Sequence, residues 1–188
     1  MKLFVKALPC LFFLLLNARL KAQTQDYVMN YQGDTLKCLI TGRVLGDGRF
    51  KSPDMKKPQK IFIEHIREYY ISETNTTYRA VIKPNNTPVF LPVIEKGKIA
   101  LYEEQVDSSM PGINGGIGFH SFKTNWFVSK GTITVDDLKR HRKEKVANLI
   151  RDNKAVYDKF MLDNDFSDEA LRNIIHLYNT GKPLQKSI

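Results

Sequence analysis

The sequence predicts an α+β fold, in which an antiparallel β meander is followed by about three C-terminal helices. Between residues 26 and 135, apolar residues recur at every second position in short runs separated by turn residues. That period is typical of strands with one buried face. From about residue 136 the apolar residues recur at helical spacing instead. The connections between the predicted strands are too short for a crossover helix, so neighbouring strands should be antiparallel.

The first two predicted strands form a hairpin about residues 32–34, where Gly33 can adopt the positive φ of a tight turn. Residues 52–58 are polar and proline-bearing, which indicates an exposed loop. Seven to nine strands in this order favour a curved sheet or an open barrel, and both alternatives remain open. The last two predicted strands form a hairpin about residues 130–131. The predicted strands span residues 27–31, 35–41, 61–63, 66–72, 77–83, 89–94, 99–103, 126–129 and 132–135.

Three helices are predicted after residue 135. The first begins near residue 136, where acids suit the positive end of a helix dipole. The second spans residues 154–162, with Asp152 or Asn153 as its cap. The third begins after Ser167 as N-cap and ends at Gly181. Helical spacing predicts that the buried residues are Leu138, Val146, Leu149, Ile150, Val156, Phe160, Met161, Leu171, Ile174, Ile175 and Tyr178.

Residues 1–22 have the features of a secretory signal peptide. Lys2 and Lys6 give a positive start, residues 11–16 form an apolar run, and a small-residue cleavage site ends at Ala22. The run is too short to span a bilayer, so an uncleaved anchor is a weaker alternative. Lipidation at Cys10 is another, but it would truncate the apolar run. We therefore expect a mature chain that is periplasmic or extracellular and has no transmembrane span.

The mature chain, residues 23–188, is expected to form a single α+β domain that is β-rich over 23–135 and helical over 136–188. Signal removal lowers the formal charge from +9 to about +5, because four basic residues and no acid leave with it. This excess is mild and mixed with acids, so no nucleic-acid partner is predicted. Only Cys38 remains after cleavage, which excludes an intramolecular disulfide. Its alternation with Leu36 and Ile40 predicts a buried, inert thiol.

One glycine-rich segment, residues 110–120, is a candidate ligand site. Bare backbone amides in such loops can hold anionic groups. A phosphate loop also needs a helix N-terminus behind it, whereas this segment leads into a strand, so a plain strand connection is the alternative interpretation. The candidate ligand-binding residues are Gly112, Asn114, Gly115, Gly116, Gly118 and His120.

A basic cluster on the first predicted helix is a second candidate site. Lys139, Arg140, Arg142 and Lys143 could contact an anionic surface such as phospholipid or lipopolysaccharide. The cluster lacks the interleaved aromatic residues that nucleic-acid binders use for stacking. The alternative is a solvated helix face.

No other residue cluster has the spacing of a known catalytic or metal site. The four histidines lack metal-ligand spacing, and residues 163–174 lack the glycine and bidentate Glu of a calcium loop. No serine lies in a nucleophile elbow. A carboxylate pair for glycoside cleavage stays open, because the fold rather than sequence spacing would bring it together. We predict no metal, no cofactor and no catalytic residue.

Residues 31–42 read YQGDTLKCLITG, an opening hairpin, and residues 97–102 read GKIALY. A passage of strand, Lys–Gly, strand and helix follows at 126–138, and the last helix ends in Tyr178 and Asn179. Together with the Ala–Gln cleavage site at 22–23, these features resemble a loose group of uncharacterised exported Bacteroidetes proteins with an NGDT-type β-hairpin. The resemblance implies export and an α+β architecture. It assigns no activity and no catalytic residue.

The leading interpretation is a non-catalytic binding or interaction protein of the cell envelope or the secreted fraction. Its partner would be an envelope protein or a surface glycan or lipid, contacted through sheet-edge strands or the glycine-rich loop. Two alternatives stay open. One is a hydrolase acting on envelope or extracellular polymers, and the other is a binder of lipid or lipopolysaccharide through the basic helix. The oligomeric state is not predicted.

Overall fold

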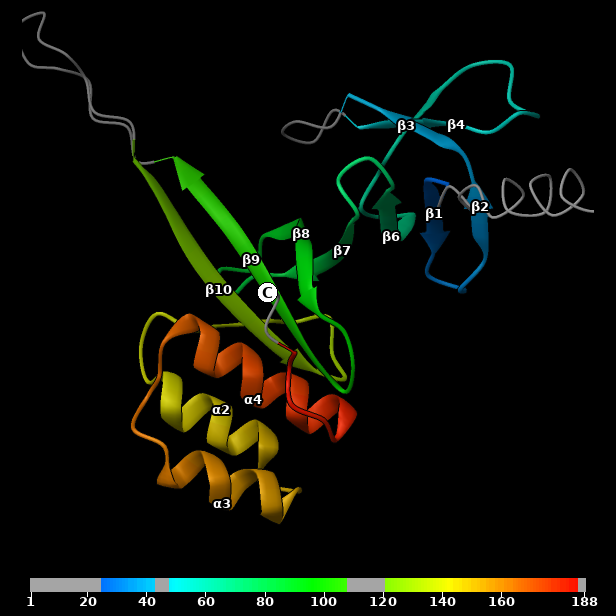
Figure 1. Cartoon of the computed structure of the whole chain (residues 1–188). Helices are drawn as coiled ribbons and strands as arrows, with labels where there is room; N and C mark the ends of the chain where they lie inside the picture. The colour runs from blue at the N-terminus through cyan, green and yellow to red at the C-terminus, as the bar shows by residue number, and fades with distance from the viewer. Residues whose placement is uncertain (1–24, 43–47, 108–120, 186–188) are drawn as a thin grey trace, which may run out of the picture.

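The computed structural model describes residues 25–42, 48–107 and 121–185. These residues form an eight-stranded sheet, a three-stranded sheet and three C-terminal helices, so the predicted α+β class is confirmed (Figure 1). The large sheet has the order β11-β10-β9-β8-β7-β6-β1-β2, and the small one β3-β4-β5. Neighbouring strands are antiparallel throughout. Neither sheet closes into a barrel.

The strands are β1 (Tyr27–Asn30), β2 (Thr35–Lys37), β3 (Leu39–Thr41), β4 (Arg49–Lys51), β5 (Gln59–Lys60), β6 (Ile66–Ile71), β7 (Thr76–Ile82), β8 (Pro88–Glu95), β9 (Ile99–Asp107), β10 (Phe122–Lys130) and β11 (Asp136–Asp137). The helices are α2 (Arg142–Ile150), α3 (Lys154–Leu162) and α4 (Asp168–Thr180). From β6 to β10 each strand pairs with the next, which is the predicted meander.

The predicted strand over 35–41 is wrong, because it divides at Cys38 between the two sheets. Asp26 explains the division. Its carboxylate accepts the Ile40 N–H at 2.9 Å and the Ser72 N–H at 2.8 Å, and its backbone carbonyl accepts the Cys38 N–H at 3.0 Å. These bonds turn the chain out of the large sheet. Cys38 is buried as predicted, and burial followed by the nearby Asp26 charge raises the pKa of its thiol to about 11.

Two other predicted strands are wrong. Residues 61–63 lead into a turn in which the His65 and Ile66 N–H groups both donate to the Phe62 carbonyl. Residues 132–135 do not return along β10 as a hairpin. They cross to β7 instead, where the Ile82 N–H donates to the Ile133 carbonyl at 2.9 Å and the Val135 N–H donates to the Ile82 carbonyl at 3.0 Å. Val135 of this crossing segment is thereby buried in a small cluster with side chains of β7, β8, β9 and β10.

The helix predictions differ in their accuracy. The first helix begins at Arg142 rather than near residue 136, because residues 136–137 pair with β10 as β11. α3 spans the predicted residues behind Asn153, although Met161 is 41% exposed rather than buried. α4 begins after Ser167, whose hydroxyl accepts the Ala170 N–H, and ends at Gly181 with φ 71°. Both ends of α4 were predicted.

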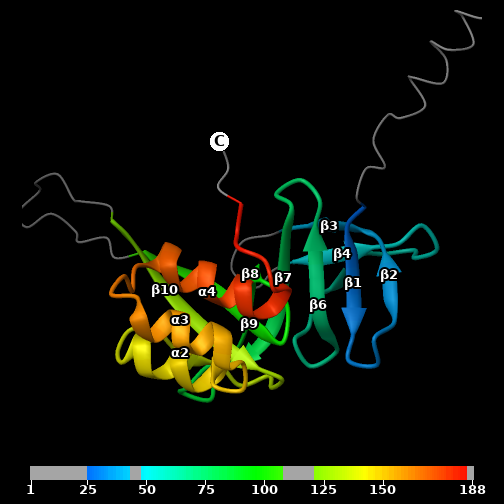
Figure 2. The ribbon, with the colours of Figure 1, turned by 60° about the horizontal axis from the view of Figure 1, so that its bottom comes forward.

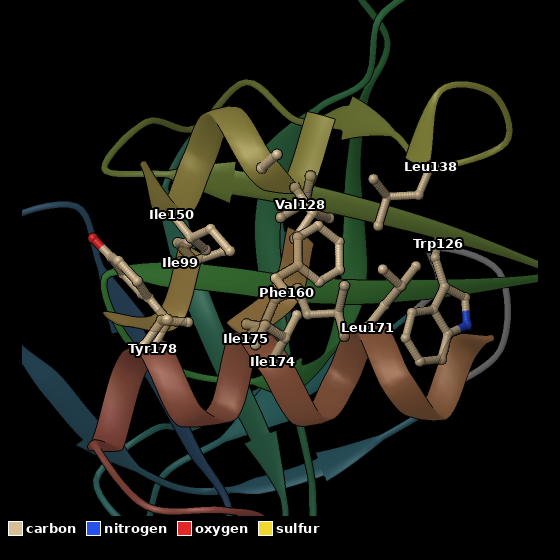
Figure 3. Close-up of a cluster of buried hydrophobic side chains, with 14 residues drawn as sticks. Ile99, Trp126, Val128, Leu138, Ile150, Phe160, Leu171, Ile174, Ile175 and Tyr178 are labelled. Carbon is tan, nitrogen blue, oxygen red and sulfur yellow. The ribbon is translucent and has the colours of Figure 1, made fainter. Parts of the chain in front are cut away.

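The main hydrophobic cluster lies between the helices and β9–β10. Figure 3 shows Leu171, Ile174, Ile175 and Tyr178 along the side of α4 that faces the strands, with Tyr178 near Ile99 and Leu171 near Trp126. Side chains of all three helices join this cluster with residues of β9 and β10. A second cluster packs the small sheet against β1 and β6. In Figures 1 and 2 the helices lie away from β1, β2 and β6.

Candidate functional site

Several predicted features lie outside the described residues. They are the signal peptide of residues 1–22 and the whole candidate ligand loop, Gly112, Asn114, Gly115, Gly116, Gly118 and His120. These stay predictions. No helix in the part of the chain that the structure describes is long and apolar enough to cross a membrane.

The basic cluster lies on and just before α2, and several of its charges are used within the fold. Arg142 donates to Asp168 at 2.6 Å and to the Leu138 carbonyl at 2.6 Å. The Lys143 ammonium lies 4.6 Å from the ring centroid of Phe166. Lys139 and Arg140 are exposed. The structure thus holds two of the four predicted surface-binding residues in contacts that position α2 and α4.

A different site is built by one row of residues across the large sheet. Strand register places Lys37 of β2 opposite Tyr27 of β1, Tyr27 opposite Tyr70 of β6, and Tyr70 opposite Thr77 of β7. Residues directly opposite each other in antiparallel strands project from the same face. We call this face, which carries Tyr27, Tyr70 and Thr77, the open face.

The row lines a hollow of about 750 Å³. The rings of Tyr27 and Tyr70 stack with centroids 5.5 Å apart and planes inclined by 16°. The Tyr70 hydroxyl donates to Asn75 Oδ1 at 2.9 Å. We call this the tyrosine hollow, and it is lined by Gln25, Tyr27, Thr35, Lys37, Tyr70, Asn75, Thr77, Val93, Ile94 and Lys96.

A buried ion pair lies next to the tyrosine hollow. Glu68 accepts two hydrogen bonds from Arg79, at 2.7 and 3.0 Å, and one from the Tyr27 hydroxyl at 2.9 Å. Lys96 Nζ lies 3.7 Å from the same carboxylate, whose side chain is only 6% exposed. Side chains from β1 and β7, and from the residue after β8, therefore all contact this one carboxylate of β6.

The charges of this pair are stabilised by their contacts. Burial acts to raise the pKa of Glu68, but hydrogen bonds from Arg79 and Tyr27 outweigh it and leave the pKa below its usual value. Burial and the Glu68 carboxylate raise the pKa of Tyr27 to about 12. Glu68 thus stays ionised and Tyr27 stays protonated at neutral pH. A carboxylate held in this way is a poor proton donor for catalysis.

A second hollow, of about 410 Å³, is lined in part by Arg79 of this ion pair. Arg67, Arg79 and Lys98 supply three cations to its wall, and Tyr102 and Ser129 supply hydroxyls. The Tyr102 and Ser129 oxygens are 3.5 Å apart and both residues are buried. We call this the cationic pocket. No acid is among the described residues that line either hollow.

The turn after β8 carries a cation into each hollow and is fixed from α4. Asn179 accepts the Ile99 N–H at 3.0 Å and donates to the Ile99 carbonyl at 2.7 Å, as a neighbouring strand would. A Cβ on Gly97 would collide with the Asn179 side chain, so glycine allows this close approach. Lys96 and Lys98, on either side of Gly97, are thereby positioned by the last turn of α4.

A third groove, of about 660 Å³, contains more aromatic residues but they serve packing. Tyr69 stacks on Tyr78 with centroids 4.8 Å apart and meets Phe90 edge to face at 5.0 Å. All three pack against the buried cluster beneath the small sheet. Burial raises the pKa of the Tyr69 hydroxyl. We therefore assign these rings to the core.

Sequence reasoning did not predict the open face. Its two stacked residues, Tyr27 and Tyr70, lie far apart in the chain, and no local motif joins them. The weak signal present is the alternation of Tyr27 with Met29 and of Tyr70 with Glu68, which places these residues on one strand face each. The pairing of the strands then brings the two faces together.

The fold defines the chain as an α+β protein in which an antiparallel sheet is covered at one end by a three-helix segment. No family model, curated protein or solved structure matches this chain.

Proposed function

We propose that the chain is an exported, non-catalytic binding protein of the cell envelope or the secreted fraction, and that it binds a glycan on the open face. The observation that carries this proposal is the cross-strand row of Tyr27, Tyr70 and Thr77 along the tyrosine hollow. The signal-like features of residues 1–22 and the resemblance to exported Bacteroidetes proteins support export.

The chemistry of the hollow suits a sugar ring. The face of an aromatic ring carries partial negative charge, and the C–H bonds on one side of a pyranose are weakly positive, so the two surfaces attract when stacked. Sugar hydroxyls need nearby donors and acceptors. Asn75 and Lys37, which line the same hollow, can supply them.

The experiment is affinity electrophoresis of residues 23–188 through gels that contain single soluble polysaccharides. The panel holds two matched pairs: polygalacturonate with its methyl ester, and dextran sulfate with dextran. We expect at least one polymer to retard the wild-type protein. Tyr70→Ala should abolish this retardation, whereas Tyr70→Phe, which keeps the ring, should retain it.

The control is Phe122→Ala, which removes an aromatic ring that is 71% exposed on β10 and lies outside the hollow. It should migrate like the wild type. Circular dichroism confirms that each variant is folded. Retardation by no polymer in the panel, or equal retardation of Tyr70→Ala and the wild type, would contradict glycan binding at this site.

A further inference from the structure

We infer that the glycan is acidic, and that the cationic pocket binds a carboxylate or sulfate group on it while the tyrosine hollow holds a sugar ring. This inference rests on the proposed function. It adds a second subsite and a chemical class to it.

The charge around the two hollows is strongly unbalanced. Five cationic side chains line them, and none of the described lining residues is an acid. Glu68 carries a single negative charge and pairs with two of these cations, through hydrogen bonds to Arg79 and a distance of 3.7 Å to the Lys96 ammonium. The five cations are Lys37, Arg67, Arg79, Lys96 and Lys98.

The pocket also offers a geometry that suits an oxyanion. A guanidinium presents paired N–H donors to a carboxylate or sulfate, and such charge-assisted hydrogen bonds are about twice as strong as neutral ones. Arg67 is exposed, and Arg79 is held by Glu68 with its side chain 23% exposed. The fixed Arg79, the Tyr102 and Ser129 hydroxyls and the freer Arg67 and Lys98 surround one space.

The two hollows adjoin through Glu68. Tyr27, which lines the tyrosine hollow, donates to one carboxylate oxygen of Glu68, and Arg79, which lines the cationic pocket, donates to the other. Lys96 and Lys98 of the same turn face one hollow each. A chain of sugars that carries acid groups can therefore occupy both hollows at once.

The test compares the charged and neutral member of each polymer pair in the same gels. We expect the charged member to bind at least about tenfold more tightly, which is the effect of one charge-assisted contact. Arg67→Gln/Lys98→Gln should remove most of this preference, and both side chains are exposed, so the fold should persist. Added NaCl should weaken binding of the charged member only.

The matched control is Lys56→Gln/Lys57→Gln, in an exposed loop outside both hollows. It removes the same charge, so its mobility in a polymer-free gel matches that of the test variant. It should keep the preference for the charged member.

Two outcomes would overturn the inference. Equal binding of both members, with Tyr70→Ala still lacking retardation, would leave glycan binding intact and exclude the acidic class. Binding to phosphatidylglycerol vesicles, lost in Arg67→Gln/Lys98→Gln, together with no retardation by any charged polymer, would assign the cations to a membrane surface instead.

Discussion

Two regions of this molecule concentrate positive charge, and they do so in opposite ways. Around α2 the basic residues are adjacent in the sequence, yet Arg142 pairs with Asp168 at 2.6 Å and Lys145 lies 3.8 Å from Asp137. On the open face the cations come from distant positions, such as Lys37 and Lys98, and are gathered by strand pairing. A cluster of charge in the sequence therefore differs from a cluster of unmatched charge in the fold.

The two regions differ in whether their cations have acidic partners. In the helical segment the ion pairs fasten α2 to the start of α4, so the cations there have nearby acids as partners. On the open face Glu68 pairs with Arg79 and Lys96, whereas the walls lined by Lys37, Arg67 and Lys98 contain no acid among their described residues. The second arrangement leaves a positive field at the surface that can attract an anionic ligand.

The largest effect expected from this comparison is on stability. Arg79→Met leaves the Glu68 carboxylate buried without its main partner and should lower the free energy of unfolding by about 3 kcal/mol. Arg142→Met breaks a pair whose Asp168 side chain is 47% exposed, and should cost less than about 1 kcal/mol. Urea unfolding measures both. Equal losses of unfolding free energy would show that the buried and the exposed ion pair contribute equally to stability.

Gly97→Ala should cause the second largest loss of stability. The new Cβ must displace the Asn179 side chain, and such overpacking costs about 1–3 kcal/mol. The displaced turn should also weaken polymer retardation, because it carries Lys96 and Lys98. A cycle with Asn179→Ala tests the mechanism, since the two substitutions should be clearly non-additive. If the two losses of unfolding free energy simply added, the turn at Gly97 would not depend on its contact with Asn179.

The pH dependence of stability sharpens the comparison further. The pKa of Glu68 is lower in the folded chain than its usual value, so its contribution is present above the unfolded pKa and is lost as the pH falls through the folded pKa. Stability should therefore decline at acid pH. In Glu68→Gln this decline should be shallower. Thermal unfolding between about pH 2 and about pH 6, on both sides of the usual Glu pKa, measures it. An unchanged acid slope would assign the decline to other groups.

The smallest effect concerns the basic helix itself. Lys139→Gln/Arg140→Gln removes its two exposed cations, and should change retardation by the charged polymers less than about twofold, because the neighbouring charges are engaged internally. Phosphatidylglycerol vesicles provide a second measurement, since the basic-helix hypothesis expects this variant to lose vesicle binding at low salt. A large loss of polymer retardation or of vesicle binding would assign the anion site to α2 instead.

Local signals account for the parts of the fold that were predicted. Ser167 and Gly181 define the ends of α4 through contacts within one turn, so a single sequence contains them. The division at Cys38 depends on Asp26, which lies 14 residues before Ile40, and on Ser72, which lies 46 residues after Asp26. An unbroken alternation across Cys38 cannot reveal a carboxylate that draws the chain away from its sheet. Long-range hydrogen bonds decided that boundary.

The candidate site was less predictable for the same reason. The stacking of Tyr27 on Tyr70 requires the register between β1 and β6, which includes an irregularity between Met29 and Asn30. A shift of one residue would turn the rings to the opposite face. The predicted basic residues were found by adjacency alone, and adjacency carries no information on the acids that would face them.

The contact between Asn179 and Ile99 has a consequence for how the chain can be divided. One amide side chain near the end of α4 completes the backbone hydrogen bonds of the strand that follows the turn of Lys96 and Lys98. Deleting the C-terminal helix would therefore alter the walls of both hollows, although no residue of α4 lines either of them. The helical segment supports this part of the sheet, and a fragment that keeps the two hollows intact must include it.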